Sequence, residues 1–231
     1  MTCAAVHRAL TAGAFALATT FALAQPLPTS RPQDVGLSPE RLARVGTWLQ
    51  GEIDAKRIPG AVVLVARNGK VAYVETLGQQ DPASPRPMGR DSIFRIYSMT
   101  KPLVSVAAMM MVEEGKLLLE APVARYIPGF ANVRVGVEKV DGNGGKSLEL
   151  VAARRPVTVQ DLLRHTSGLT YGFFGDSLVK KAYNEALATL PPGVNNAEFA
   201  EALAKLPLHY QPGSTWDYSY STDVLGRVLE V

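Results

Sequence analysis

The order of patterns along the chain predicts an α+β fold. An apolar stripe of helical spacing comes first, two apolar runs around a tight turn follow, and a mostly helical section occupies residues 98–226. The two apolar runs would pair as an antiparallel hairpin. Because a single hairpin precedes the long helical section, we expect the sheet to be incomplete in this chain.

The first helix is expected over residues 39–56. Ser38 is a favourable N-cap, and Pro39 suits the first helical position. Apolar side chains then recur at three or four residues, which gives the helix one face that can pack on a core. These side chains are Leu42, Val45, Leu49 and Ile53.

A hairpin is expected next, over residues 61–77, and then a second helix. Asn68 and Gly69 form a two-residue turn of the kind that prefers positive φ. A polar loop with three prolines leads to residues 103–112, which are apolar on every side before Gly115 supplies a C-cap. A helix without a polar face is expected to be buried in the centre of a domain.

The remaining sequence predicts a small exposed hairpin followed by helices. The hairpin would pair residues 133–140 with residues 148–153 across a glycine-rich turn. Thr158 and Asp161 match a capping box at the start of a short helix. Further helices are expected near residues 177–190, near residues 197–206, and after Ser221 as the cap of the last one.

Composition places the chain among ordinary globular proteins. It has 231 residues, 47% of them hydrophobic and 19% charged, so it can bury a core and global disorder is excluded. Its 24 Lys and Arg against 21 Asp and Glu give a net charge of +3. The basic residues are scattered rather than gathered in a stripe, so no nucleic-acid partner is expected.

The first 24 residues have the features of a cleaved secretory signal. Arg8 precedes an apolar run, and Ala22-Leu23-Ala24 fits a cleavage site with small residues. We therefore expect a signal peptide at residues 1–24, a Pro-rich linker at 25–37 and a domain at 38–231. We therefore expect a bacterial protein that is periplasmic or secreted.

Cleavage after residue 24 would change the chemistry available to the chain. It removes Cys3, the only cysteine, so no disulfide, thiol nucleophile or thiolate metal site would remain. No membrane contact is expected after cleavage. The alternative is an uncleaved membrane anchor, which the prolines directly after the apolar run disfavour.

Two Ser-x-x-Lys pairs are candidates for nucleophilic chemistry. Residues three apart on a helix lie on one face, so a lysine can take the proton of a serine hydroxyl if burial lowers the lysine pKa. Ser177 and Lys180 open a helix with polar neighbours, which indicates a cap beside a solvated face. Ser98 and Lys101 precede the apolar helix, so we expect a desolvated Lys101. The alternative for this second pair is an N-cap with a snorkelling lysine.

Tyrosines and histidines supply further candidates. Tyr218 lies at a turn before a helix, where its hydroxyl could move a proton, although packing beside Trp216 is the simpler interpretation. His165 and His209 show no metal-ligand spacing, so structural roles are expected for both. The residues alone leave these alternatives open.

Four motifs in one order give the sequence a family resemblance. The motifs are residues 58–61 (Ile-Pro-Gly-Ala), 94–101 (Phe-Arg-Ile-Tyr-Ser-Met-Thr-Lys), 162–169 (Leu-Leu-Arg-His-Thr-Ser-Gly-Leu), and Pro212-Gly213 before 218–221 (Tyr-Ser-Tyr-Ser). From about residue 38 onward the chain resembles the class C beta-lactamase-related serine hydrolases. That family includes beta-lactamases, D-alanyl-D-alanine carboxypeptidases, D-aminopeptidases and beta-lactamase-like esterases. The resemblance implies their α+β architecture, an antiparallel sheet with a mostly helical region.

The resemblance also implies roles for individual residues. Ser98 would be the acylated nucleophile, Lys101 its proton acceptor, and Tyr218 a base and leaving-group acid. Tyr220 stands where the family's Tyr-x-Asn motif has an asparagine that binds substrate amides. This departure favours esters, and the long excursion over residues 133–153 also resembles the esterase branch.

The family's third motif is a Lys/His/Trp-x-Gly strand that supplies the second oxyanion amide. It would lie beyond residue 231, so a truncated chain is expected, and residues 1–231 alone are expected to be inactive. For the whole protein we expect a carboxylesterase that forms an acyl-enzyme on Ser98, without metal or organic cofactor. Its substrate would be a small-molecule ester. The alternatives are hydrolysis of beta-lactams or D-amino-acid peptides, or a non-catalytic binding relic of the fold.

Overall fold

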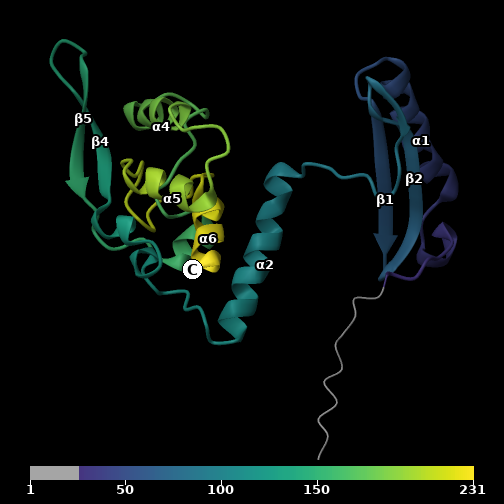
Figure 1. Ribbon diagram of the computed structural model, residues 1–231, viewed down its shortest axis with the longest axis horizontal. Coiled ribbons are helices and arrows are strands. Elements are labelled where there is room, and N and C mark those ends of the chain that lie inside the picture. The colour runs from purple at the N-terminus through teal and green to yellow at the C-terminus, as the bar shows by residue number, and fades with distance from the viewer. Residues whose placement is uncertain (1–25) are drawn as a thin grey trace, which may run out of the picture. The chain divides into compact units, whose positions relative to one another are not determined.

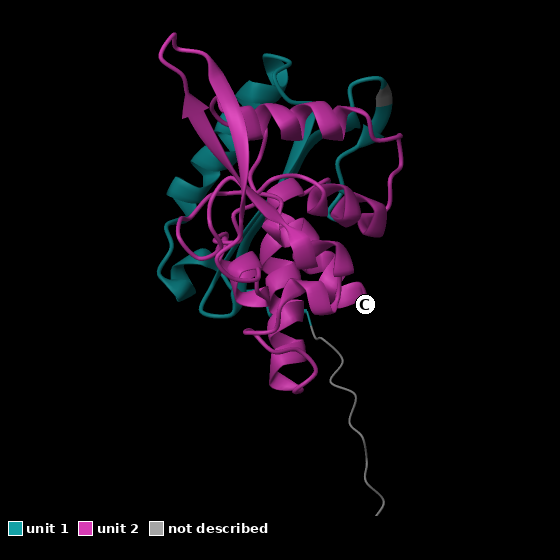
Figure 2. Cartoon of the chain, turned by 90° about the vertical axis from the view of Figure 1, so that its left-hand side faces the viewer, with its two compact units in different colours: residues 1–94 teal, residues 95–231 magenta. Residues whose placement is uncertain are grey.

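The structure is a computed structural model that describes residues 26–231, apart from the side chain of Ser84. The expected signal peptide lies outside the described residues. Within them, no helix has the length and apolar character needed to cross a membrane. The chain divides into two compact units, residues 1–94 and residues 95–231 (Figure 2).

The first unit is a three-stranded antiparallel sheet with a helix packed against it (Figure 1). Asn68 and Gly69 have φ angles of 51° and 68°, so the expected two-residue turn joins the first two strands. Ser38 Oγ accepts a hydrogen bond of 3.2 Å from the Arg41 amide, which confirms the expected cap. The elements are η1 (Pro32–Val35), α1 (Pro39–Asp54), β1 (Gly60–Arg67), β2 (Lys70–Asp81) and β3 (Ser84–Pro87).

Two features of this unit differ from the expectations. The proline-containing stretch expected as a loop forms β3, which pairs with β2 at the edge of the sheet, where the missing amide of proline is tolerated. Part of the stretch expected as a linker is also paired. The amide of Ser30 donates to the Val71 carbonyl over 2.9 Å, and the Val71 amide donates to the Pro28 carbonyl over 2.8 Å.

The second unit combines helices with a separate two-stranded antiparallel hairpin, formed by β4 and β5. Helix α6 is central to it, because α2, α3 and α5 all pack against α6. Large side chains fill the core between these helices, among them Leu162, Tyr183, Leu203 and Leu225. The elements are η2 (Tyr97–Met99), α2 (Thr100–Glu113), η3 (Val123–Arg125), η4 (Pro128–Asn132), β4 (Arg134–Val140), β5 (Lys146–Ala152), α3 (Val159–Arg164), α4 (Leu178–Ala188), α5 (Asn196–Ala204) and α6 (Ser221–Glu230).

Helix α2 is less buried than its sequence predicts. Ala108 is fully buried, and Val104 and Met111 pack against the core. Leu103 and Val106, on another side of the helix, are 62% and 60% exposed. The expectation that α2 is buried on every side is therefore wrong. The second unit packs against one face of this helix.

The starts of two other helices test the capping predictions. The capping box of Thr158 and Asp161 is present at α3. Ser221 does not cap α6, because Tyr220 occupies the N-cap position without a side-chain hydrogen bond. The Ser221 hydroxyl is buried and lies 2.8 Å from the hydroxyls of both Ser167 and Ser219.

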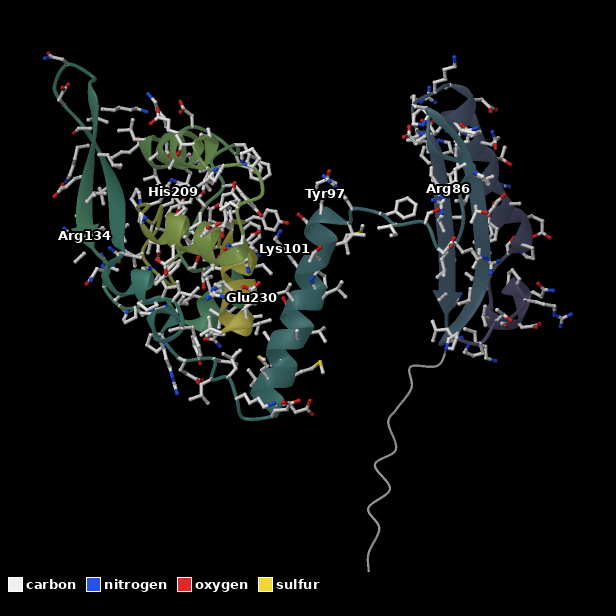
Figure 3. All side chains as sticks on the ribbon, viewed as in Figure 1. Arg86, Tyr97, Lys101, Arg134, His209 and Glu230 are labelled. Atoms are coloured by element: carbon white, nitrogen blue, oxygen red, sulfur yellow. The ribbon has the colours of Figure 1, made fainter. Side chains whose placement is uncertain are left out.

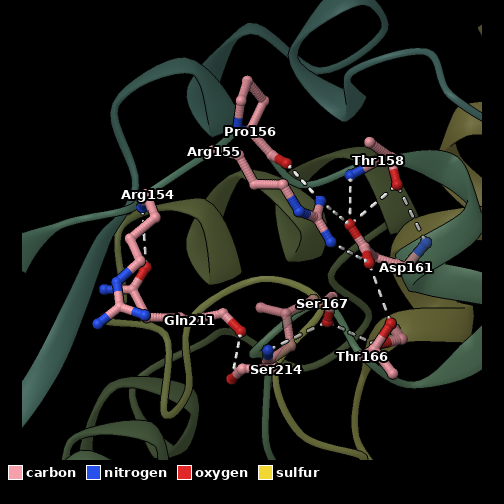
Figure 4. A network of polar contacts seen from close by, with 11 residues as sticks. Arg154, Arg155, Pro156, Thr158, Asp161, Thr166, Ser167, Gln211 and Ser214 are labelled. Atoms are coloured by element: carbon pink, nitrogen blue, oxygen red, sulfur yellow. Dashed lines mark hydrogen bonds and ion pairs between the residues drawn. The ribbon is translucent and has the colours of Figure 1, made fainter.

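The buried carboxylate of Asp161 is the centre of a polar network (Figure 4). This residue is 4% exposed, and its two oxygens accept hydrogen bonds of 2.5 and 2.8 Å from the Arg155 guanidinium. They also accept from the Thr158 amide and hydroxyl, at 3.0 and 2.9 Å, and from the Thr166 hydroxyl at 3.0 Å. Burial raises the pKa of Asp161, but the hydrogen bonds from Arg155 and Thr158 outweigh it and the pKa is lowered.

We predict that Asp161→Asn lowers the free energy of unfolding by about 3 kcal/mol at neutral pH, because it leaves the Arg155 charge and buried donors without their acceptor. Since the folded-state pKa is lowered, the wild-type advantage is present above the unfolded value of about 4 and disappears as the pH falls through the folded value. Chemical denaturation at several pH values measures both effects.

Glu114→Gln is the matched control for this prediction. Glu114 forms an ion pair of 2.6 Å with Lys116, and both side chains are exposed. Loss of this ion pair should lower the free energy of unfolding by less than about 1 kcal/mol. Equal losses of stability from the two variants would contradict the role assigned to Asp161.

Candidate active site

Ser98 and Lys101 lie together at the junction of η2 and α2. Lys101 Nζ donates a hydrogen bond of 3.3 Å to Ser98 Oγ, as the spacing of three residues predicts. Figure 3 shows Lys101 near the start of α2, on the side toward α6. Tyr97 has a φ of 46°, so the residue directly before Ser98 adopts a left-handed conformation that is strained for a bulky residue.

Two tyrosines flank the lysine. Lys101 Nζ is 4.9 Å from the centre of the Tyr218 ring and 5.9 Å from the centre of the Tyr171 ring. The two rings contact each other at 5.4 Å between their centres. The structure therefore brings together the three predicted catalytic residues, and it adds Tyr171, for which no catalytic role was predicted.

The electrostatics of the site differ from the expectation for Lys101. Burial lowers the pKa of this ammonium, but hydrogen bonding to Tyr218 and Tyr171 outweighs it, and the net pKa is raised. The expected desolvation of Lys101 is therefore present, but it does not produce the lowered pKa that a lysine base would need. Hydrogen bonding to Ser98, and then to Lys101, lowers the pKa of Tyr218 against the opposing effect of burial. The site therefore makes the Tyr218 phenol more acidic and the Lys101 ammonium less acidic.

A cavity of about 410 Å³ lies beside the Ser98 hydroxyl. Ser98, Lys101 and Tyr171 line one part of it, and Asn196 and Asp223 from α5 and α6 line another. The cavity is open to solvent and large enough for part of a small organic substrate. Asn196 and Asp223 had no signal in the sequence, because only the packing of α6 on α2, and of α5 on α6, brings them to the cavity.

Tyr220 is not among the residues that line this cavity. Its ring packs at 4.3 Å from Tyr171, 5.3 Å from Phe199 and 6.4 Å from Tyr183, measured between ring centres. Burial raises the pKa of its phenol. The side chain lies against the core, and its role in substrate binding stays a prediction.

The second Ser-x-x-Lys pair lies in a different setting. Ser177 Oγ caps α4 by accepting a hydrogen bond of 3.1 Å from the Lys180 amide, as the sequence predicts. The ammonium of Lys180 donates to the Phe174 carbonyl. Both side chains of this pair therefore form hydrogen bonds with nearby backbone groups.

The two histidines contact the segment that carries Tyr218. His165 Nδ1 accepts a hydrogen bond of 3.3 Å from the Ser219 amide, and His209 Nδ1 lies 3.2 Å from an Asp217 carboxylate oxygen. Burial, and then the charge of Lys101, lowers the pKa of His165. Within residues 26–231 there is no cluster of three or more His, Cys, Asp or Glu side chains suited to a metal ion.

Comparisons with known proteins agree with this fold. A family model described as Beta-lactamase matches residues 45–231. An uncharacterized protein of Mycobacterium tuberculosis is 41% identical over 176 residues, which cover 76% of this chain and 42% of the relative. Esterase EstB of Burkholderia gladioli is 35% identical over 193 residues, which cover 81% of this chain and 44% of the relative.

A solved structure supports the same assignment. The structure titled "EstCE1, a hydrolase with promiscuous acyltransferase activity" has a TM-score of 0.65 and 33% identity, and the match covers 82% of this chain and 46% of that one. The chain thus spans less than half the length of these similar proteins. The α+β fold, with partial sheets in this chain, is that of the beta-lactamase-type serine hydrolases. The chain belongs to the beta-lactamase family.

We predict that Tyr218 titrates below the ordinary tyrosine pKa of about 10, and that Ser98→Ala and Lys101→Met each raise its pKa. Both substitutions remove a group that stabilises the phenolate. The measurement is the ultraviolet absorbance of tyrosinate against pH, with Tyr218→Phe used to identify the transition. Lys180→Met should leave the transition in place, and an unchanged titration in Lys101→Met would contradict the electrostatic assignment.

Proposed function

We propose that the protein containing this chain hydrolyses carboxylic esters through an acyl-enzyme on Ser98. The observation that carries the proposal is the contact of the Ser98 hydroxyl with Lys101, beside a tyrosine of lowered pKa and an open cavity. Membership of a serine hydrolase family and similarity to an esterase support it.

In the acylation step, Ser98 Oγ attacks the carbonyl carbon of the ester and its proton passes to the Tyr218 phenolate. Lys101 stays an ammonium and stabilises that phenolate, since its own pKa is raised. The carbonyl oxygen gains negative charge near the start of α2, where backbone amides stabilise anions. When the bond to the alkoxide breaks, Tyr218 returns the proton to that oxygen, and the alcohol leaves.

Deacylation uses the same groups in the same order. A water molecule attacks the acyl carbon and gives a proton to the Tyr218 phenolate. The bond to Ser98 Oγ then breaks, and Tyr218 returns the proton to the serine oxygen. The products are a carboxylic acid and the free enzyme, so no further reactant is needed.

The preference for esters follows from Tyr220. Tyr220 has no carboxamide to offer a substrate amide, as the asparagine of the family motif would, and its ring packs against Tyr171 and Phe199. Hydrolysis of beta-lactams or D-amino-acid peptides is the second candidate, supported by the family as a whole. A binding protein without turnover is the third.

We predict that Ser98→Ala and Lys101→Ala each reduce kcat/KM for a p-nitrophenyl ester by at least about a thousandfold, because members of one catalytic unit fail together. The assay uses the full-length protein. Lys180→Ala is the matched control and should retain activity, since Lys180 contacts the Phe174 carbonyl and not Ser98. Equal losses from the two lysine variants would contradict the choice of site.

We also predict that short-chain p-nitrophenyl esters are hydrolysed faster than a chromogenic cephalosporin. A fluorophosphonate should label Ser98, and mass spectrometry of the labelled peptide locates the adduct. Faster turnover of the cephalosporin would favour the second candidate function. A protein that binds these compounds but forms no adduct would favour the third.

A further inference from the structure

His165 and the residues on either side of Tyr218 are joined by two hydrogen bonds. The Asp217 amide donates to the His165 carbonyl over 2.9 Å. The Ser219 amide donates to His165 Nδ1 over 3.3 Å. One residue thus holds the backbone both before and after Tyr218, and its ring lies 4.9 Å from the Tyr218 ring, between ring centres.

Buried hydroxyls extend this attachment. Ser219 Oγ lies 3.4 Å from His165 Nδ1 and 2.8 Å from Ser221 Oγ, and Ser221 Oγ lies 2.8 Å from Ser167 Oγ. The three serines are fully buried. Because unpaired buried hydroxyls are costly, this chain of contacts fixes residues 219 and 221 against residues 165 and 167.

The backbone of His165 also restricts what can replace it. Its φ of 55° places it in the left-handed region at the end of α3. Asparagine tolerates this conformation better than most residues, and its side-chain oxygen can take the place of a histidine Nδ1 acceptor. His165→Asn is therefore a conservative variant that keeps the acceptor and loses the titratable ring.

We propose that His165 is a positioning residue, which holds Tyr218 against Ser98 and Lys101 by accepting hydrogen bonds from the amides of Asp217 and Ser219. Only the expected effect of His165 on catalysis rests on the proposed function. Its effect on the position of Tyr218 does not. The Ser219 amide can only donate, so His165 Nδ1 must carry a lone pair and the ring proton sits on Nε2. The attachment requires a neutral ring.

Protonation of His165 would oppose this arrangement. It would place a proton on Nδ1 facing the Ser219 amide, and a second positive charge near Lys101. The other charged or titratable groups around the ring are Tyr218, whose ring contacts it, and Asp217, whose charge favours protonation. Burial and the charge of Lys101 outweigh Asp217 and lower the pKa of His165, so the attachment is expected to be lost only at pH values below the ordinary histidine pKa.

The test compares three variants of the full-length protein. His165→Leu removes the acceptor and should reduce kcat about tenfold to a hundredfold, with a smaller change in KM, because Tyr218 is displaced from the reacting groups. His165→Asn should retain most of the wild-type activity and should lack the additional fall of kcat/KM in acid that is expected of the wild type. Arg164→Asn changes the exposed neighbouring side chain and should behave as wild type.

The titration of Tyr218 by its absorbance separates this inference from the proposed function. In His165→Leu the pKa of Tyr218 should rise towards its ordinary value, and in His165→Asn it should stay low, whether or not the protein hydrolyses esters. Thermal unfolding of each variant controls for loss of the fold. An unchanged Tyr218 titration and pH profile in folded His165→Leu would overturn the inference, even if Ser98-dependent ester hydrolysis were found.

Discussion

The arrangement of the second unit depends on a buried charge, the carboxylate of Asp161. This carboxylate accepts hydrogen bonds from Arg155 and Thr158, and a further one of 3.0 Å from the hydroxyl of Thr166. The carbonyl oxygen of Thr166 in turn accepts a hydrogen bond of 2.7 Å from the Gly213 amide. A charge removed from water needs several donors, and the donors of this one come from the segments before and after α3. Asp161 thereby fixes the loop that approaches Tyr218.

The position of Tyr218 is a consequence of that loop. Residues 165–168 run beside two later segments: the Gly168 carbonyl accepts the His209 amide over 2.6 Å, and the His165 carbonyl accepts the Asp217 amide over 2.9 Å. These contacts bring a residue far along the chain to the start of α2. The candidate site is thus assembled from a helix start, a loop and a turn, and the loop and turn are held by backbone hydrogen bonds rather than by the side chains of Ser98, Lys101 and Tyr218.

Local patterns predicted much of this structure. The cap at Ser38, the turn at Asn68 and Gly69, and the capping box at Asp161 depend on residues within four positions of one another, so the sequence contains all the information needed. The i to i+3 contact of Ser98 and Lys101 is of the same kind. The edge strand β3 was missed because its prolines predict a loop unless the pairing with β2 is known.

Properties that depend on distant residues were not predicted. The pKa of Lys101 is raised rather than lowered because Tyr171 and Tyr218 lie beside it, and no local pattern shows that proximity. The sequence predicts Ser221 as a helix cap, but its hydroxyl lies within hydrogen-bonding distance of Ser167 and Ser219 instead. Placing Asp223 at the cavity likewise requires the packing of α6 beside α2.

The left-handed backbone of Tyr97 has a consequence for sequence variation at the site. This residue is 78% exposed, so its side chain is constrained little by packing, whereas its φ of 46° penalises most side chains. Mutational tolerance there should follow backbone preference: glycine and asparagine should be accepted readily, and β-branched residues poorly, the reverse of the tolerance usual in strands. Selection at position 97 would then act on the backbone geometry that positions the neighbouring Ser98, and not on the side chain at position 97.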